Sequence, residues 1–235
     1  MKFISGGYYI IVPEQRPDYM DENLIPNTVL SVSECICDFH PEINILWSGS
    51  TETKNKYTQR LNISSHTYEQ IENWVNDKFD AGVFEYPQVF TSVELAREFM
   101  SKFLSKVSDT QIIGIGLPED RVEAFCEYEG LGDPQEEQNG VEKLLLSKTM
   151  LESNDSRFLG YEVLGYENGG FHSYLCNGLE KEFHEHFKFS LNNNGFIGSL
   201  EDASHYCKYS NQEEIGTELV NWFPWAIFKY KKYNI

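Results

Sequence analysis

The hydrophobic residues change their period along this chain, and that change restricts the folds open to it. Between residues 3 and 47 they form short β-branched and aromatic runs, such as Tyr8–Val12, which are typical of strands. Between residues 67 and 107 they recur every three or four positions, which is typical of amphipathic helices. Alternation then returns at Gln111–Leu117. The sequence therefore predicts an α+β fold, with a mainly antiparallel sheet covered by helices.

Cap spacings mark the start of the two clearest helices. Thr67 and Gln70 have the spacing of a capping box, and an apolar stripe follows as far as Phe79. Thr91 and Glu94 repeat that spacing before a longer stripe. Pro118 is predicted to begin a third helix, and the run Trp222–Tyr230 to form a strand with Pro224 at its entry or on a sheet edge.

Two further patterns predict longer elements. Residues 28–39 alternate in character, which indicates a strand that carries Cys35 and Cys37 on one face, with Ile43–Trp47 as its hairpin partner. After Gly170, apolar residues at steps of four predict a helix that ends near Phe187. The copies Leu159–Glu162 and Leu164–Glu167 are offset by five residues, so in a strand Glu162 and Glu167 face opposite sides.

Acidic residues gather in the middle of the chain. Residues 119–142 contain nine carboxylates and one basic side chain, and the Gly-rich stretch inside them is typical of a linker or a surface flap. This predicts an N-terminal α+β lobe at 1–129, an acidic loop or linker at 130–141 and a C-terminal α+β lobe at 142–235. A single compact domain is the alternative.

The overall charge limits the partners that the chain can bind. Asp and Glu number 37 against 19 Lys and Arg, which gives a net charge of −18. Such a chain is repelled by phosphate backbones, so no nucleic-acid partner is expected. The closing Lys229, Lys231 and Lys232 are interpreted as a small solubility tail.

The termini and the cysteines predict a compartment. The longest apolar run is Trp222–Phe228, whereas a bilayer-crossing helix needs about 20 residues, and the N-terminus lacks a signal-peptide pattern. We therefore expect no membrane partner and a cytoplasmic location. Five cysteines without framework spacing fit a reducing compartment, where they act as small hydrophobes.

No cofactor or metal is expected. The stretch Gly114-Ile-Gly116 follows a predicted strand, but it lacks the third glycine of a phosphate-binding loop, and Glu119 and Asp120 occupy the first helical turn. The densest reactive set is His172, Cys176, Glu180, His184 and His186. His184 and His186 are too close in sequence to share the helix face that a zinc site needs.

The same five residues are also compatible with a nucleophilic catalytic site. His172 and Cys176 are four residues apart, and on one helix they form a base and a nucleophile. The simpler interpretation buries Cys176 in the core and places the histidines and glutamates on a solvated face.

A resemblance covers residues 159–230. The strings Leu159-Gly-Tyr-Glu, Gly170-Phe-His-Ser-Tyr-Leu-Cys-Asn and Trp222-Phe-Pro-Trp resemble uncharacterised bacterial proteins that are similar to the cytoplasmic immunity proteins of polymorphic toxin systems. The resemblance implies a bacterial, non-enzymatic protein-binding molecule. It assigns no functional residue.

Three functions follow from these patterns. The first is an acidic binding protein, an immunity-type inhibitor of a basic toxin, which contacts its partner through eight carboxylates: Glu119, Asp120, Glu123, Glu127, Glu129, Asp133, Glu136 and Glu137. The second is a small hydrolase or transferase that uses Cys176 and His172. The third is a structural or regulatory module that dimerises through Trp222–Tyr230. The sequence leaves the oligomeric state open.

Overall fold

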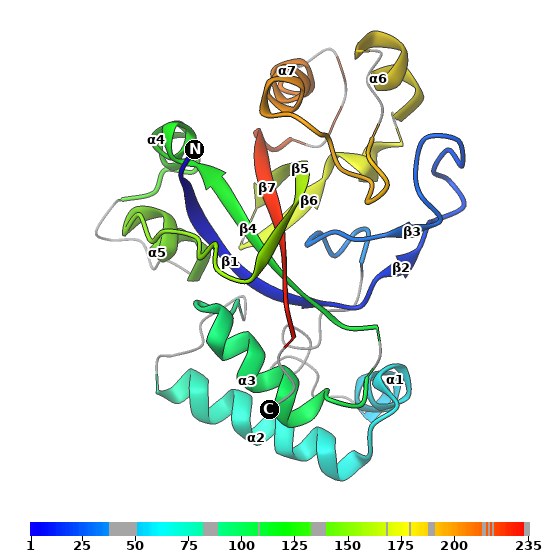
Figure 1. Cartoon of the computed structure of the whole chain (residues 1–235), viewed down its shortest axis with the longest axis vertical. Helices are drawn as coiled ribbons and strands as arrows, with labels where there is room; N and C mark the ends of the chain where they lie inside the picture. The colour runs from blue at the N-terminus through cyan, green and yellow to red at the C-terminus, as the bar shows by residue number, and fades with distance from the viewer. Residues whose placement is uncertain are drawn as a thin grey trace.

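The computed structural model confirms the α+β class, with helices packed on a curled antiparallel sheet (Figure 1). It describes residues 1–37, 51–81, 89–107, 109–132, 140–167, 169–178, 180–187, 191–212, 215, 217 and 219–232. No helix in these ranges has the length and the hydropathy that crossing a bilayer requires.

Five strands form the main sheet in the order β1–β4–β7–β5–β6, and every neighbouring pair is antiparallel. Their bounds are β1 Phe3–Ile11, β4 Gln111–Pro118, β7 Trp222–Tyr230, β5 Ser156–Glu167 and β6 Gly170–Ser173. The short strands β2 (Glu14–Gln15) and β3 (Thr28–Val29) pair separately. Because β4 pairs with β7, the sheet takes strands from both sides of the acidic stretch. The division into two lobes stays a prediction, and residues 133–139 lie outside the described residues.

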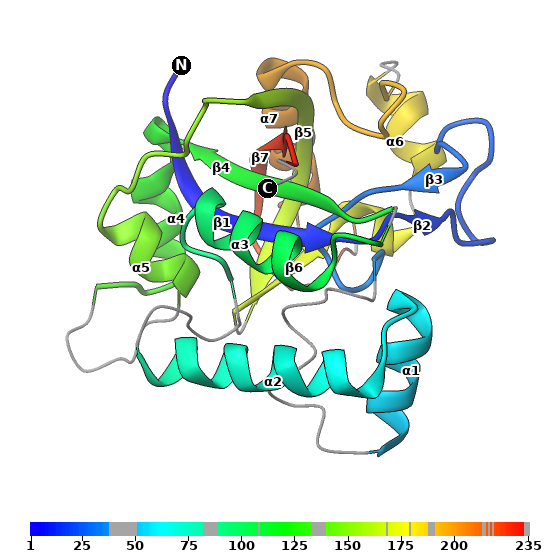
Figure 2. The same ribbon diagram turned by 60° about the horizontal axis from the view of Figure 1, so that its bottom comes forward.

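The helices gather in groups around this sheet. They are α1 Thr51–Leu61, α2 Ser65–Asp80, α3 Val93–Phe103, α4 Val122–Tyr128, α5 Gly140–Leu146, α6 Glu180–Phe187 and α7 Leu200–Ser210, with short 3₁₀ turns η1 Glu119–Arg121 and η2 Tyr174–Asn177. Figure 1 shows α1, α2 and α3 together on one side of the sheet and α6 and α7 on the other, and Figure 2 shows α3 lying across β1. Helices α2 and α3 begin within three residues of the predicted caps, after Ser64 and Ser92.

Each face of the sheet has its own apolar packing. The inner face, defined here as the one that carries Ile113 and Trp225, packs against α4, where the rings of Phe125 and Trp225 are 5.6 Å apart. The outer face, which carries Tyr8 and Tyr230, packs against α3 on the strands β1 and β4. Burial of these aromatic side chains contributes most of the free energy that holds the helices to the sheet.

The predicted strand at residues 28–39 is wrong from Leu30 to Cys37, and residues 38 and 39 lie outside the described residues. Residues 33–37 form a turn, in which the carbonyl of Ser33 accepts hydrogen bonds from the backbone of Ile36 and Cys37. The turn leaves Cys35 exposed and Cys37 buried, so the two sulfurs do not share a face. The hydroxyl of Ser31 accepts the Ser33 N–H, and such local bonds compete with a strand ladder. The predicted partner strand Ile43–Trp47 lies outside the described residues.

The predicted continuous helix after Gly170 is also wrong. Residues 170–173 form the edge strand β6, η2 follows, and α6 begins only at Glu180. Gly178 separates η2 from α6 with a φ of 65°, a left-handed conformation that glycine adopts without a steric penalty. His172 and Cys176 therefore lie on a strand and a 3₁₀ turn and not on one helix.

Candidate functional site

Three segments bring a thiol, an imidazole and a carboxylate into one row, which we call the thiol site. Cys35 lies in the turn 33–37, His172 on β6, and Glu167 at the end of β5. The Sγ of Cys35 is 3.7 Å from Nδ1 of His172, and Nε2 of His172 is 3.5 Å from Oε2 of Glu167. His172 lies opposite Gly165, two residues before Glu167, so strand geometry places both side chains on one side of the hairpin.

The environment of Cys35 favours its thiolate. The pKa of Cys35 falls to about 5, chiefly because the Cys176 thiol donates a hydrogen bond to it, with further help from Ser33 and His172. These contacts outweigh the desolvation of the partly buried sulfur, which acts in the opposite direction. Cys35 is exposed to solvent, so a reagent can reach its sulfur, and the lowered pKa favours the thiolate at neutral pH.

Cys176 lies behind Cys35 and keeps its proton. Its Sγ is 3.8 Å from the hydroxyl of Ser33, and the side chain is half-buried. The pKa of Cys176 is raised far above the ordinary thiol value, first by its hydrogen bond to Cys35 and then by burial. For this tightly coupled pair, the exposed sulfur is the thiolate and the inner sulfur is the donor.

A buried carboxyl group holds the turn against the sheet. Glu162 is 2% exposed, and it accepts hydrogen bonds from the hydroxyls of Ser31 at 2.6 Å and Ser173 at 2.8 Å. Burial raises the pKa of Glu162 to about 7, against the opposing effect of the two hydroxyls. Since Ser31 precedes the turn and Ser173 follows His172, Glu162 links the segments that carry the thiol and the imidazole.

The strand pattern places Glu162 and Glu167 on opposite faces of β5, as predicted. Glu162 pairs across the sheet with Trp225 and so faces inward, while Glu167 reaches His172 on the other face. Ser31 contacts Glu162 on one face and Cys35 contacts His172 on the other, so residues 31–35 pass around the edge strand β6.

This arrangement can perform nucleophilic chemistry. A thiolate beside an imidazole is the reactive pair of cysteine-dependent acyl transfer, and a carboxylate on the second ring nitrogen orients the imidazole. The sequence-predicted pair was Cys176 with His172. The structure instead places Cys35 against His172 and Cys176 against Cys35, so the nucleophile that the geometry supports is Cys35.

The sequence pattern gave no signal for Cys35, because its partners His172 and Cys176 lie 137 and 141 residues further along the chain. Of the other members of the predicted reactive set, the side chain of Glu180 lies outside the described residues, and the two histidines do not join the site. His184 and His186 lie exposed on α6, where the His186 ring packs 4.4 Å from that of Tyr209. Among the described residues, no group of three or more His, Cys, Asp or Glu has an arrangement that holds a metal ion.

The described members of the predicted acidic contact set lie on η1, on α4 and, for Glu129, directly after α4. The four exposed members are Glu119, Asp120, Glu123 and Glu127. Glu119 forms an ion pair with Lys2 at 3.9 Å, and Asp120 with Arg121 at 3.7 Å. Glu129 is half-buried, and its pKa rises to about 7 through burial and the nearby Glu142 and Glu167. Asp133, Glu136 and Glu137 lie outside the described residues.

The strand that the third hypothesis uses for dimerisation lies inside the sheet. From Ala226 to Tyr230, β7 pairs with β4 on one side and with β5 on the other. Pro224 precedes the β4 pairing and faces only β5, which accommodates its missing N–H. The stretch 226–230 therefore has no open edge for a second copy.

Comparisons of the chain with protein-family models, with curated proteins and with solved structures gave no match. The functional argument therefore depends on the geometry of the chain itself.

Proposed function

We propose that this protein is a cysteine-dependent hydrolase or transferase in which Cys35 is the nucleophile. The observation that carries the proposal is the row from Cys35 through His172 to Glu167, with contacts of 3.7 and 3.5 Å. His172 is the acid and base, and Glu167 orients its ring. The lowered pKa of Cys35 supports the same assignment.

The proposed reaction is acyl transfer. The Cys35 thiolate attacks the acyl carbon, the C–S bond forms, and the carbonyl electron pair moves onto oxygen. When that pair returns, the bond to the leaving group breaks, and the leaving group takes a proton from the His172 imidazolium. Water or another acceptor then gives a proton to His172 and attacks the thioester, which releases the acyl product and restores the thiolate.

Alkylation at defined pH tests the nucleophile. Iodoacetamide should label Cys35 first, with a rate that rises through an inflection near pH 5 and is flat above it. Cys126 is the internal control, because burial raises the pKa of its thiol. Peptide mass spectrometry measures the labelling of each cysteine. Equal labelling of Cys35 and Cys126 at pH 6 would contradict the proposal.

Acyl transfer itself is tested with a chromogenic ester. With p-nitrophenyl acetate, the protein should release a burst of about one nitrophenol per chain as the thioester accumulates. Cys35→Ser should abolish the burst, whereas Cys126→Ser should keep it. A burst that survives in Cys35→Ser would overturn the assignment of the nucleophile.

The second proposal is an acidic binding protein that acts as an immunity-type inhibitor of a basic partner. The observation in its favour is the run of exposed carboxylates on η1 and α4, next to the exposed ring of Tyr128. Such a surface steers a basic protein to it, and the attraction weakens as salt screens the charges.

Charge-matched variants separate this proposal from the effect of net charge. The quadruple variant Glu119→Gln, Asp120→Asn, Glu123→Gln and Glu127→Gln should lose binding of a basic protein captured from lysate at low salt. The control variant neutralises four exposed acids elsewhere: Glu22, Glu52, Asp80 and Glu201. Equal capture by the two variants, with equal dependence on salt, would contradict a specific acidic surface.

A further inference from the structure

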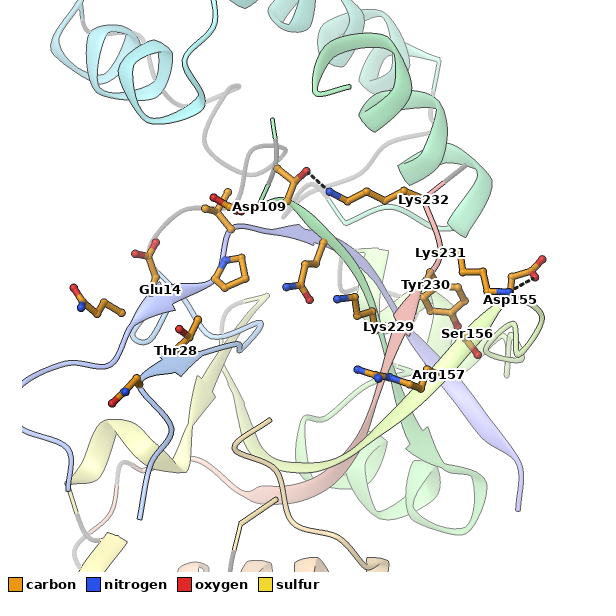
Figure 3. Close-up of a pocket in the computed structure, with 16 residues that line it drawn as sticks. Glu14, Thr28, Asp109, Asp155, Ser156, Arg157, Lys229, Tyr230, Lys231 and Lys232 are labelled. Atoms are coloured by element: carbon orange, nitrogen blue, oxygen red, sulfur yellow. Dashed lines mark hydrogen bonds and ion pairs between the residues drawn. The ribbon is translucent and has the colours of Figure 1, made fainter. Parts of the chain in front are cut away.

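A cleft at the other end of β5 collects basic side chains in this acidic protein. Its volume is about 1120 Å³, and it lies where β5, β7 and β4 meet the β2–β3 hairpin (Figure 3). Arg157, Lys229, Lys231 and Lys232 all line it, which is four of the 19 basic residues in a chain of net charge −18. The cleft is large enough to admit a small molecule.

Two of these cations lie side by side. Arg157 on β5 is the direct cross-strand partner of Lys229 on β7. Figure 3 shows both side chains extending in the same direction from their strands, into the cleft. Like charges directly opposite each other destabilise a sheet, so the repulsion between Arg157 and Lys229 lowers the stability of the fold. The pKa of Lys229 is lowered by burial and by the charge of Arg157.

The other charged groups of the cleft already have partners. Lys231 pairs with Asp155 at 3.7 Å, and the ammonium of Lys232 donates to the hydroxyl of Thr110 at 3.0 Å with Asp109 nearby. Glu14 pairs with Arg60. Among the residues that the structure describes, no carboxylate neutralises Arg157 or Lys229.

We infer that the pair Arg157 and Lys229 forms a binding site for the phosphate group of a small phosphorylated molecule. A phosphate dianion neutralises both cations at once, and the planar guanidinium offers two parallel N–H donors to its oxygens. The hydroxyls of Thr28 and Ser156 line the same cleft and can donate further hydrogen bonds. The protein's net charge disfavours a nucleic-acid polymer, so the ligand is small.

The site is separate from the thiol site. Arg157 and Gly165, the cross-strand partner of His172, are eight residues apart on β5, which is about 26 Å of strand. The inference therefore does not depend on the proposed reaction of Cys35, and its test uses binding and not activity.

Inorganic pyrophosphate is the probe, measured by isothermal calorimetry and by thermal shift against sodium chloride of equal ionic strength. Arg157→Gln and Lys229→Gln should each weaken pyrophosphate binding about tenfold or more, since each removes a charge-assisted hydrogen bond. The matched control is Lys208→Gln, which removes an exposed positive charge on α7 and should leave the affinity within about twofold.

Two results would overturn the inference. One is a thermal shift that sodium chloride reproduces at equal ionic strength, which would indicate general screening. The other is an equal loss of affinity in Lys208→Gln, which would indicate a response to net charge. Arg157 is exposed, so its variant keeps the test informative if Lys229→Gln folds poorly.

Discussion

The two ends of β5 place charged groups on the same strand in opposite ways. Near Glu167, a carboxylate, an imidazole and a thiolate lie in a row, and each group stabilises its neighbour. Near Arg157, two cations lie opposite each other with no carboxylate on them among the described residues. At the first end the charged groups find partners within the chain, whereas at the second we propose that an anion supplies the opposite charge. Opposite charges in contact stabilise each other within the chain, whereas like charges in contact repel each other and attract an oppositely charged ligand.

The largest expected effect concerns Glu162, which anchors the thiol end. Its pKa in the folded protein is raised to about 7, so its contribution to stability is present below the unfolded pKa of 4.5 and is lost as the pH rises through 7. Glu162→Gln should remove a pH dependence of about 2–3 kcal/mol between pH 5 and pH 8 in urea unfolding. Glu123→Gln, an exposed change on α4, is the control. An unchanged slope in Glu162→Gln would contradict the anchoring role.

The next effect concerns Cys176, whose hydrogen bond does most to lower the pKa of Cys35. Cys176→Ala removes the hydrogen-bond donor to the thiolate, so the pKa of Cys35 should rise toward the ordinary thiol value. Alkylation of Cys35 at pH 6 should slow by more than about tenfold. Cys207→Ala changes a fully buried thiol away from the site and serves as the control for core disturbance. Unchanged kinetics in Cys176→Ala would remove the inner thiol from the site.

A smaller effect is expected from His172, which contributes less to the thiolate than Cys176 does. His172→Gln should slow the alkylation of Cys35 at pH 6 by a few-fold, up to about tenfold. It should keep the nitrophenol burst, because p-nitrophenolate leaves without a proton, but it should slow the steady release after the burst, because water loses its base for hydrolysis of the thioester. His205→Gln, an exposed change on α7, should alter neither. A steady rate in His172→Gln equal to that of the natural protein would leave Cys35 reactive but without its proposed catalytic base.

The smallest effect belongs to the basic end of β5. Lys229→Gln removes the repulsion with Arg157, so in the absence of phosphate the variant should melt about 1–3 °C higher than the natural protein. The gain should shrink as salt is added, because salt screens the repulsion. Scanning calorimetry at low and high ionic strength measures this difference. A lower melting temperature at low salt would mean that Lys229 has a stabilising partner.

Much of the local structure followed from the sequence. The helices α2 and α3, the strand β4 and the closing strand β7 were all predicted near their observed positions, because period and cap residues act over a few neighbours. The opposite orientation of Glu162 and Glu167 followed from the two-residue period of a strand. The prediction of a strand after Val29 was wrong, because local hydrogen bonds of Ser31 and Ser33 form a turn in place of strand pairing.

The two candidate sites came only from the tertiary structure. Cys35 and His172 meet because residues 31–35 pass around the edge of β6, and no local period encodes that path. From the sequence alone, Lys229 is interpreted as part of a basic tail. In the fold β7 lies beside β5, so Lys229 lies directly opposite Arg157. The sequence determined which segments are helices and strands, because those preferences are local. The partners of each reactive side chain depend on strand order and register, which the whole fold decides.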